Sequence, residues 1–69
     1  MQSIHFLVNG NLYYVNKETN LLKIIKYFNY SESLLVVEYN RLICNKTEWN
    51  KIIIKDHDRI ELVTIVGGG

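Results

Sequence analysis

The sequence is poor in the residues that interrupt regular structure, with four glycines and no proline. Three of the glycines, Gly67 to Gly69, are the last three residues, so Gly10 is the only glycine in the rest of the chain. A glycine run buries no side chain and loses much conformational entropy when it becomes ordered, so it contributes little to a fold. We therefore expect a domain over residues 1–66 and a flexible glycine tail over residues 67–69.

Other absences exclude several classes of protein. The single cysteine, Cys44, cannot form an intramolecular disulfide, which fits a reducing compartment. No apolar run approaches the roughly 20 residues of a membrane-spanning helix, and the N-terminal residues lack the basic and apolar regions of a signal peptide. The net charge is +1, from 8 basic and 7 acidic residues that are spread evenly, so we expect no nucleic-acid surface.

Alanine is absent too, whereas isoleucine, asparagine, lysine and tyrosine are abundant. Alanine and proline have GC-rich codons and the abundant residues have AT-rich ones, so the composition indicates an AT-rich genome. A plastid or an AT-biased bacterium has such a genome. The composition therefore predicts a protein of the plastid stroma or of the cytoplasm.

Runs of β-branched and aromatic residues predict five short strands. Two of them flank the pair Asn9-Gly10, which supplies the positive φ angles of a tight hairpin turn. The predicted strands are residues 4–8, 12–15, 34–40, 42–45 and 59–66. Asn45 and Thr47 are candidate caps for a short helical turn after the fourth strand, and a polar turn over residues 55–58 precedes the last strand.

One substantial helix is predicted between the hairpin and the later strands. Its apolar positions recur at helical spacing, and they are Leu21, Leu22, Ile25 and Phe28. Asn20 or Thr19 can cap its first turn by accepting a hydrogen bond from a free backbone N–H. A hairpin, a crossover helix and further strands predict an α+β fold of the β-grasp, or ubiquitin-like, architecture. Its sheet is expected to be mixed and four- to five-stranded, with one main helix across one face.

The last predicted strand carries apolar side chains on both faces. Alternation places Ile60, Leu62 and Val66 on one face, where we expect Ile60 and Leu62 to be buried. Val63 and Ile65 lie on the other face. They are either buried in a central strand or part of a partner-docking patch on the uncovered face of the sheet, and the pattern favours neither.

Side chains that could support catalysis are few. Cys44 is a candidate thiol nucleophile with His5 or His57 as its base, but no spacing connects them, and a lone cysteine is more often a buried apolar residue. Asp56, His57 and Asp58 are candidate metal ligands, but adjacent residues in a turn rarely converge on one ion. We therefore expect neither an enzyme nor a metal site.

The terminal carboxylate offers a different chemistry. Coupling a carboxylate to AMP gives a mixed anhydride with a good leaving group. Three extended residues reach roughly 10 Å, and glycine lets the backbone enter a narrow channel because it has no Cβ to clash. Bare glycines therefore suit a tail that carries its carboxylate into the active site of another protein.

Over essentially its whole length the chain resembles the ThiS family, the sulfur-carrier proteins of thiamine biosynthesis. The resemblance lies in the order of the segments "LVNG", "NLLKII", "VEYN", "LICNKTEW" and "DRIELVTIVGGG". The chain departs from the family pattern at His57-Asp58, where Gly-Asp is usual. It departs again at Glu38, where a small apolar residue is frequent.

The resemblance implies a mechanism at Gly69. A ThiF-like enzyme uses ATP to adenylate this residue, sulfur replaces AMP to give a thiocarboxylate, and a ThiG-like thiazole synthase takes the sulfur for the thiazole ring of thiamine. Gly68 corresponds to the penultimate glycine, which enters the channel of the partner, and Gly67 extends the tether. The sulfur is expected to come from cysteine through a donor such as a cysteine desulfurase. The chain itself is expected to need no cofactor and to bind neither nucleic acid nor a membrane.

Three alternatives share parts of this pattern. The small subunit of molybdopterin synthase is also a β-grasp sulfur carrier that ends in Gly-Gly. A ubiquitin-like modifier would use the same tail chemistry but attach to lysine side chains. A β-grasp binding module with a glycine scar left by cloning would have no terminal chemistry at all.

Overall fold

In the computed structural model, which describes residues 2–65, Asn9 and Gly10 form the turn of the first hairpin. Their φ angles are 50° and 81°, which are the positive values that a two-residue hairpin turn requires. Strand β1 (Ile4–Val8) pairs antiparallel with β2 (Asn11–Val15) on either side of this turn. The hairpin predicted from Asn-Gly is therefore confirmed.

The helix α1 (Leu21–Tyr27) is the only α-helix within residues 2–65. Its cap is Asn20, whose side-chain oxygen accepts a hydrogen bond from the backbone N–H of Lys23 at 2.9 Å. Thr19, the other predicted cap, instead accepts at its carbonyl from the N–H of Ile54 at 3.0 Å. No helix in the described part of the chain has the length and apolar character needed to cross a membrane.

The apolar face of α1 packs against the sheet. Leu21 and Ile25 are fully buried, as predicted, whereas Leu22 and Phe28 are half-buried against the same core. Ile24 is also buried, although the predicted face did not include it. With 3.6 residues per turn, a buried stripe of about 100° or more has room for two consecutive residues, so Ile24 and Ile25 share it.

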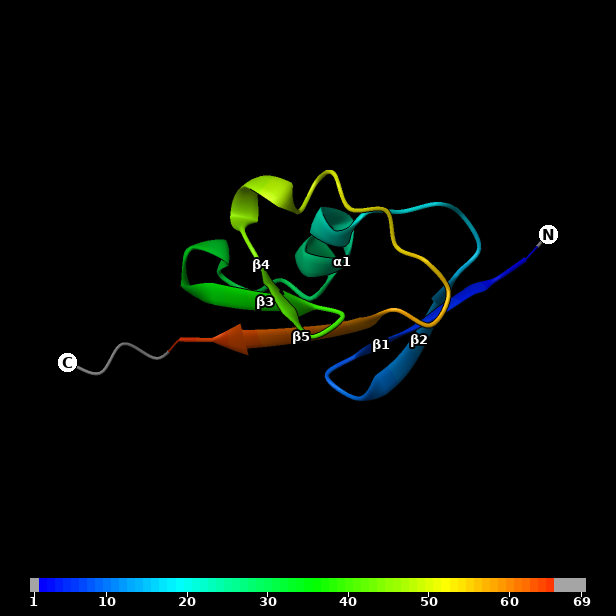
Figure 1. Cartoon of the computed structure of the whole chain (residues 1–69), viewed down its shortest axis with the longest axis horizontal. Coiled ribbons are helices and arrows are strands. Elements are labelled where there is room, and N and C mark those ends of the chain that lie inside the picture. Colours follow the sequence, from blue (N-terminus) through cyan, green and yellow to red (C-terminus); the bar gives the residue numbers. More distant parts are fainter. Residues whose placement is uncertain (1, 66–69) are drawn as a thin grey trace.

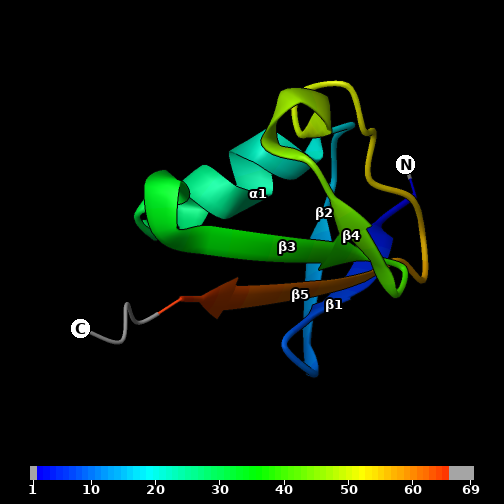
Figure 2. The same cartoon turned by 60° about the vertical axis from the view of Figure 1, so that its left-hand side comes forward.

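The five strands form one mixed sheet in the order β2-β1-β5-β3-β4 (Figure 1). The three later strands are β3 (Leu35–Tyr39), β4 (Leu42–Cys44) and β5 (Arg59–Thr64). β1 and β5 are parallel, and the other neighbouring pairs are antiparallel. Figure 2 shows α1 across one face of this sheet, and no element within residues 2–65 covers the opposite, open face. The predicted β-grasp architecture is confirmed.

Five strand boundaries differ from the prediction by one or two residues. β2 begins one residue earlier, at Asn11, and β3 and β4 each end one residue earlier, at Tyr39 and Cys44. The other two are the start of β3 and the end of β5. Leu34 ends a short 3-10 turn, η1 (Glu32–Leu34), so β3 begins one residue later than expected. β5 ends at Thr64, and Val66 lies outside the described residues. Short 3-10 segments are common at the ends of regular elements, and the apolar pattern alone does not distinguish them from a strand.

The segment after β4 forms a second 3-10 turn, η2 (Lys46–Glu48), where a helical turn was predicted. Asn45 occupies the position before it but its side chain makes no capping hydrogen bond, and Thr47 lies inside the turn. Asn45 is therefore at the predicted cap position without the capping bond, and the prediction of Thr47 as a cap is wrong. The turn is held instead by Trp49, which is 2% exposed and whose Nε1 donates to the carbonyl of Cys44 at 3.2 Å.

Replacing Ile25 by alanine should lower the free energy of unfolding by about 2–5 kcal/mol, because the removed atoms leave a cavity in a core of only moderate size. Ile25 is completely buried. Its neighbour Lys26 is exposed, so Lys26→Ala is a matched control that should change stability by less than about 0.5 kcal/mol. Urea unfolding of both variants measures the difference, and equal losses would contradict the assigned helix face.

Candidate functional site

The predicted reactive residues, Gly67 to Gly69, lie outside the described residues, which end at Ile65. The structure does show how the chain is held just before the tail. β5 is the central strand of the sheet and points away from the β1–β2 hairpin (Figure 1). Just beyond its end, the N–H of Ile65 donates to the carbonyl of Leu34 at 2.8 Å. Backbone hydrogen bonds to the sheet therefore continue as far as residue 65.

The side-chain amide of Asn9 holds β5 from the opposite side. Its oxygen accepts from the N–H of Leu62 at 2.8 Å, and its nitrogen donates to the carbonyl of Leu62 at 3.2 Å. The backbone N–H of Asn9 also donates to the carbonyl of Ile60 at 2.9 Å. The amide thus imitates the backbone of a neighbouring strand and extends the short parallel ladder between β1 and β5. The sequence pattern predicts only a turn at Asn9, because a side-chain contact 53 residues away leaves no local signal.

Val63 and Ile65 lie on the open face, with 54% and 55% of their surface exposed. Ile60 and Leu62 point to the opposite face and are 0% and 4% exposed, as predicted for the core. Burial in a central strand therefore does not account for Val63 and Ile65. Their role in partner docking remains a prediction, and their exposure on the last strand is what supports it.

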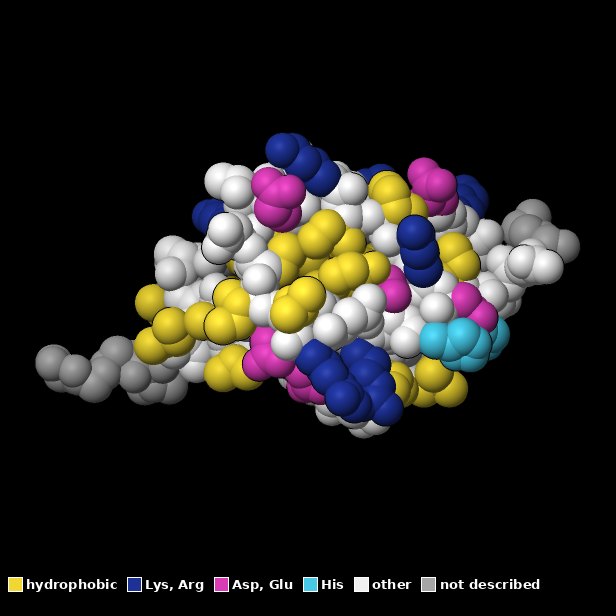
Figure 3. Space-filling model, in the orientation of Figure 1, with side chains coloured by type: hydrophobic (Ala, Val, Ile, Leu, Met, Phe, Trp, Pro, Cys, Tyr) yellow, Lys and Arg dark blue, Asp and Glu magenta, His cyan; other side chains and the backbone are white. Residues whose placement is uncertain are grey.

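Two further apolar residues extend this pair. Val36 lies directly opposite Val63 in the β3–β5 register, and Ile43, 75% exposed, lies on the same face of β4. We call Val36, Ile43, Val63 and Ile65 the open-face patch. Figure 3 shows apolar side chains gathered at the end of the molecule toward which β5 points. Val36 and Ile43 were not predicted as site residues, because their proximity to Val63 depends on the register of three strands.

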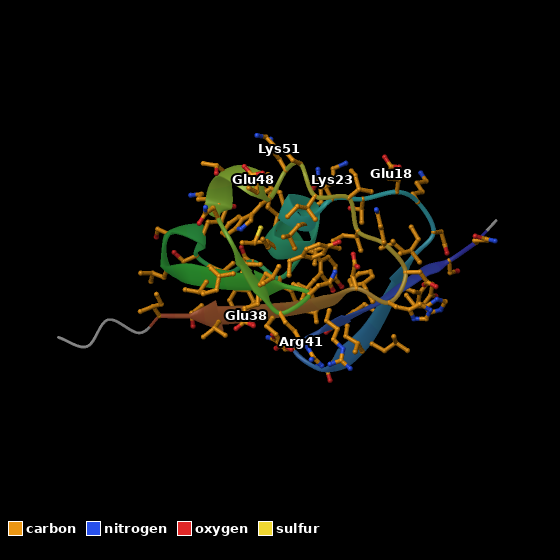
Figure 4. The ribbon with its side chains drawn as sticks, viewed as in Figure 1. Glu18, Lys23, Glu38, Arg41, Glu48 and Lys51 are labelled. Carbon is orange, nitrogen blue, oxygen red and sulfur yellow. The ribbon has the colours of Figure 1, made fainter. Side chains whose placement is uncertain are left out.

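Two carboxylates border the open-face patch. Glu38 on β3 lies directly opposite Glu61 on β5, and neither forms an ion pair within the described part of the chain. Like charges in this position disfavour strand pairing. Arg59 lies on the same face of β5 as Glu61, and Arg41 lies in the turn after β3 (Figure 4). The open face therefore combines an apolar end with a charged band, which suits contact with another protein.

Asp58 has a structural role. It is 6% exposed, and its Oδ2 accepts from the hydroxyl of Tyr39 and from the N–H of Lys55, the latter at 2.7 Å. Its Oδ1 accepts from the side-chain nitrogen of Asn40 at 3.1 Å. Burial of the phenol and the Asp58 carboxylate together raise the pKa of Tyr39 far above its ordinary value. The segments "VEYN" and "DRIELV" are therefore joined by one hydrogen-bond network that fixes the start of β5.

The three adjacent candidate metal ligands do not converge. Asp58 points inward, whereas Asp56 lies on the surface, 3.2 Å from Nε2 of His57. The backbone N–H of His5 donates to Asp56 at 2.8 Å, and this bond together with the nearby histidines lowers the pKa of Asp56. Within residues 2–65 no group of three or more His, Cys, Asp or Glu side chains is arranged to hold a metal ion. His57 has a φ of 71°, a conformation that glycine adopts more readily.

Cys44 and the histidines are also separate. β5 and β3 lie between β1, which carries His5, and β4, which carries Cys44. At roughly 4.8 Å per strand, the two strands are about 14 Å apart across the sheet. Burial and the neighbouring Glu48 raise the pKa of the Cys44 thiol. A thiol that stays protonated and has no base beside it is a poor nucleophile.

The ThiS family model matches residues 6–69 of the chain. An uncharacterized protein ycf40 from Trieres chinensis is 53% identical over 64 residues, which cover 93% of this chain and 88% of that protein. An uncharacterized protein ycf40 from Pyropia yezoensis is 28% identical over 67 residues, covering 97% and 94%. The crystal structure of the thiamine biosynthesis protein ThiS from Geobacter metallireducens superposes with a TM-score of 0.79 at 22% identity, covering 96% of this chain and all of that one.

Proposed function

The chain belongs to the ThiS family, and on that premise we propose that it is a sulfur carrier in thiamine biosynthesis. The observation that carries the proposal is the extent of the family match, which continues through the three glycines to Gly69. The structure supports it, because the strand that leads to this tail is the central one and is hydrogen-bonded as far as Ile65. A rigid domain that ends in a slender tail suits delivery of the terminal carboxylate to other proteins.

The reacting group in this proposal is the carboxylate of Gly69. A carboxylate oxygen attacks the α-phosphorus of ATP in a ThiF-like adenylating enzyme, an O–P bond forms, and pyrophosphate leaves. The product is an acyl adenylate, in which AMP is a good leaving group. Gly67 and Gly68 pass through the channel of the enzyme, because a backbone without Cβ atoms occupies the smallest cross-section.

Sulfur then replaces AMP on the acyl carbon. A persulfide that a cysteine desulfurase has generated attacks the carbon, a C–S bond forms, and AMP leaves. A thiol cleaves the resulting acyl disulfide, so that the thiocarboxylate remains on Gly69 and the second sulfur leaves in a new disulfide. A ThiG-like thiazole synthase accepts the carried sulfur for the thiazole ring.

In this scheme the chain is a protein co-substrate and its partners are the catalysts. ATP binds to the adenylating enzyme, so the chain needs no cofactor of its own. The separation of Cys44 from His5 supports this division, because it leaves the thiol without His5 as a base. Two observations support the plastid stroma as its location. The amino-acid composition indicates an AT-rich genome, and the relatives named ycf40 are plastid-encoded proteins.

The family match favours this function over the three alternatives. A molybdopterin synthase subunit or a ubiquitin-like modifier would share the fold and the tail, but the matching family model is that of ThiS. A glycine scar is disfavoured because the match includes residue 69. Intact mass spectrometry of the protein from its native cell tests the proposal directly. A population in which one oxygen of Gly69 is replaced by sulfur is expected, and a conjugate to a lysine side chain would indicate a modifier instead.

Docking of the ThiF-like enzyme is expected to involve the open-face patch. Val63→Asp should weaken binding of the enzyme at least tenfold, a change of about 1.4 kcal/mol, because it places a charge in an apolar contact. Leu12→Asp is the matched control. Leu12 is 67% exposed but lies on β2, the edge strand that is separated from β5 by β1. Isothermal titration calorimetry measures both affinities. Equal effects of the two substitutions would exclude the open-face patch as the docking surface.

A further inference from the structure

A groove runs between the outer side of β2 and the helix α1. It has a volume of about 330 Å³, at the lower end of the range of roughly 300–1,000 Å³ for ligand pockets. Tyr13, Val15, Lys23, Tyr27 and Phe28 are among the residues that line it. We call it the β2–α1 groove. A space of this size accommodates one or two side chains of a larger partner.

The strand beside the groove has an unpaired edge. β2 is the first strand in the order of the sheet, so one of its two sides has no neighbouring strand within residues 2–65. In an antiparallel strand, every second residue directs its N–H and C=O to such an edge. Sheet proteins normally protect an edge with charged residues, proline or a bulge. No Asp, Glu, Lys, Arg or Pro occurs in residues 1–16, and the β1–β2 register is continuous without a bulge, so this edge lacks those protections.

Aromatic rings form the wall of the groove. The ring of Phe28 lies 5.2 Å from that of Tyr13 and 5.1 Å from that of Tyr27, with an edge-to-face arrangement in both pairs. Tyr27 is 77% exposed. Such a large exposed ring beside an apolar groove is typical of protein contact surfaces, where tyrosine is enriched.

The rim of the groove is basic. Lys23, in the first turn of α1 (Figure 4), lines it and forms no ion pair among the described residues. The second charged residue of the helix is Lys26, and the sequence of α1 contains no acidic residue. Glu18 precedes the helix but is not among the residues that line the groove. The charge of the rim therefore complements a carboxylate.

We propose that the β2–α1 groove binds an extended segment of a partner protein, which adds to the edge of β2 as a sixth strand. Its backbone pairs with the free N–H and C=O groups of β2, which is a recurrent mode of peptide recognition. One apolar side chain of the segment enters the groove against Tyr13 and Phe28, and an acidic side chain of the segment meets Lys23. This surface is separate from the open-face patch, so the inference does not depend on the proposed function.

Titration of the ¹⁵N-labelled full chain with two pools of capped octapeptides tests the proposal. In both pools alternate positions sample Val, Leu, Ile and Phe, except that one of these same positions is fixed as Asp in the first pool and as Lys in the second, because side chains two residues apart share a face of a strand. The Asp pool should shift the amide resonances of residues 11–16 and 21–28 and leave those of β4 unchanged. The Lys pool should bind about two- to fivefold more weakly, the change expected for an exposed ion pair.

A charge reversal identifies the contact with Lys23. Lys23→Glu should exchange the preference, so that the Lys pool binds more tightly than the Asp pool. Lys26→Glu is the control, because Lys26 lies on the same helix but not in the groove, and it should leave the preference for Asp unchanged. Circular dichroism confirms that both variants fold.

Three results would overturn the proposal. The first is the absence of amide resonance shifts with either pool. The second is a set of shifts confined to the residues of the open-face patch. The third is concentration-dependent dimerisation through β2 in sedimentation experiments without peptide, which would show that the occupant of the edge is a second copy of the chain.

Discussion

Deleting Gly69 should abolish thiocarboxylate formation and leave the domain folded. Because the backbone is hydrogen-bonded to the sheet as far as Ile65, the distance from the docked domain to the reacting carboxylate is set by the four residues that follow. Removing one of them withdraws the carboxylate by about 3.5 Å. A misplacement of even about 1 Å at a reacting centre can lower a rate a hundredfold, so adenylation should fall below detection.

The measurement is an assay with the cognate adenylating enzyme, ATP and a sulfur donor, read by intact mass spectrometry. Gly68→Trp should have nearly the same effect, because a bulky side chain next to the reacting carbon obstructs the channel. Cys44→Ala and His57→Ala are the controls and should retain sulfur transfer, since neither residue takes part in the proposed chemistry. Urea unfolding should show equal stability for the chain with and without Gly69.

A different pattern would support the binding-module alternative. There, tail deletion would have no effect on function, and substitutions on the folded surface would matter instead. A chain without Gly69 that still supported thiazole formation would exclude the carrier function. The prediction therefore distinguishes a chemical role of the terminus from a structural one.

Local signals in the sequence were sufficient to predict most of the fold. The pair Asn9-Gly10 specifies a hairpin because it tolerates positive φ angles, and the spacing of Leu21 and Ile25 specifies a helix face. The position of Trp49 was not predictable in this way. It lies in an irregular segment with no periodicity, yet it is buried and its indole N–H is bonded to the carbonyl of Cys44.

The candidate site was predictable only in part. Alternation in β5 placed Val63 and Ile65 on one face, but whether that face is covered depends on where α1 packs. Val36 and Ile43 join them only through strand register, which is fixed by contacts far apart in sequence. The reactive glycines were inferred from chemistry and family resemblance, and they lie outside the described residues.

The buried carboxylate of Asp58 leads to the second prediction of large effect. Asp58→Ala should lower the free energy of unfolding by about 3 kcal/mol, because it leaves three part-buried donors without their acceptor, each at the lower end of the range of roughly 1–3 kcal/mol. These donors are the hydroxyl of Tyr39, the side-chain nitrogen of Asn40 and the N–H of Lys55. Such a loss is a large fraction of the roughly 5–15 kcal/mol that stabilises a domain.

Asp56→Ala is the matched control for Asp58→Ala, because Asp56 lies in the same turn but on the surface and accepts one backbone bond from His5. Its loss should be much smaller. Fluorescence of the single tryptophan, Trp49, reports unfolding in urea because the ring is buried. If Asp58→Ala does not fold, Asp58→Asn keeps one acceptor oxygen and should show an intermediate loss. Equal stabilities of the Asp56 and Asp58 variants would mean that the network does not hold the start of β5, and with it the strand that leads to the tail.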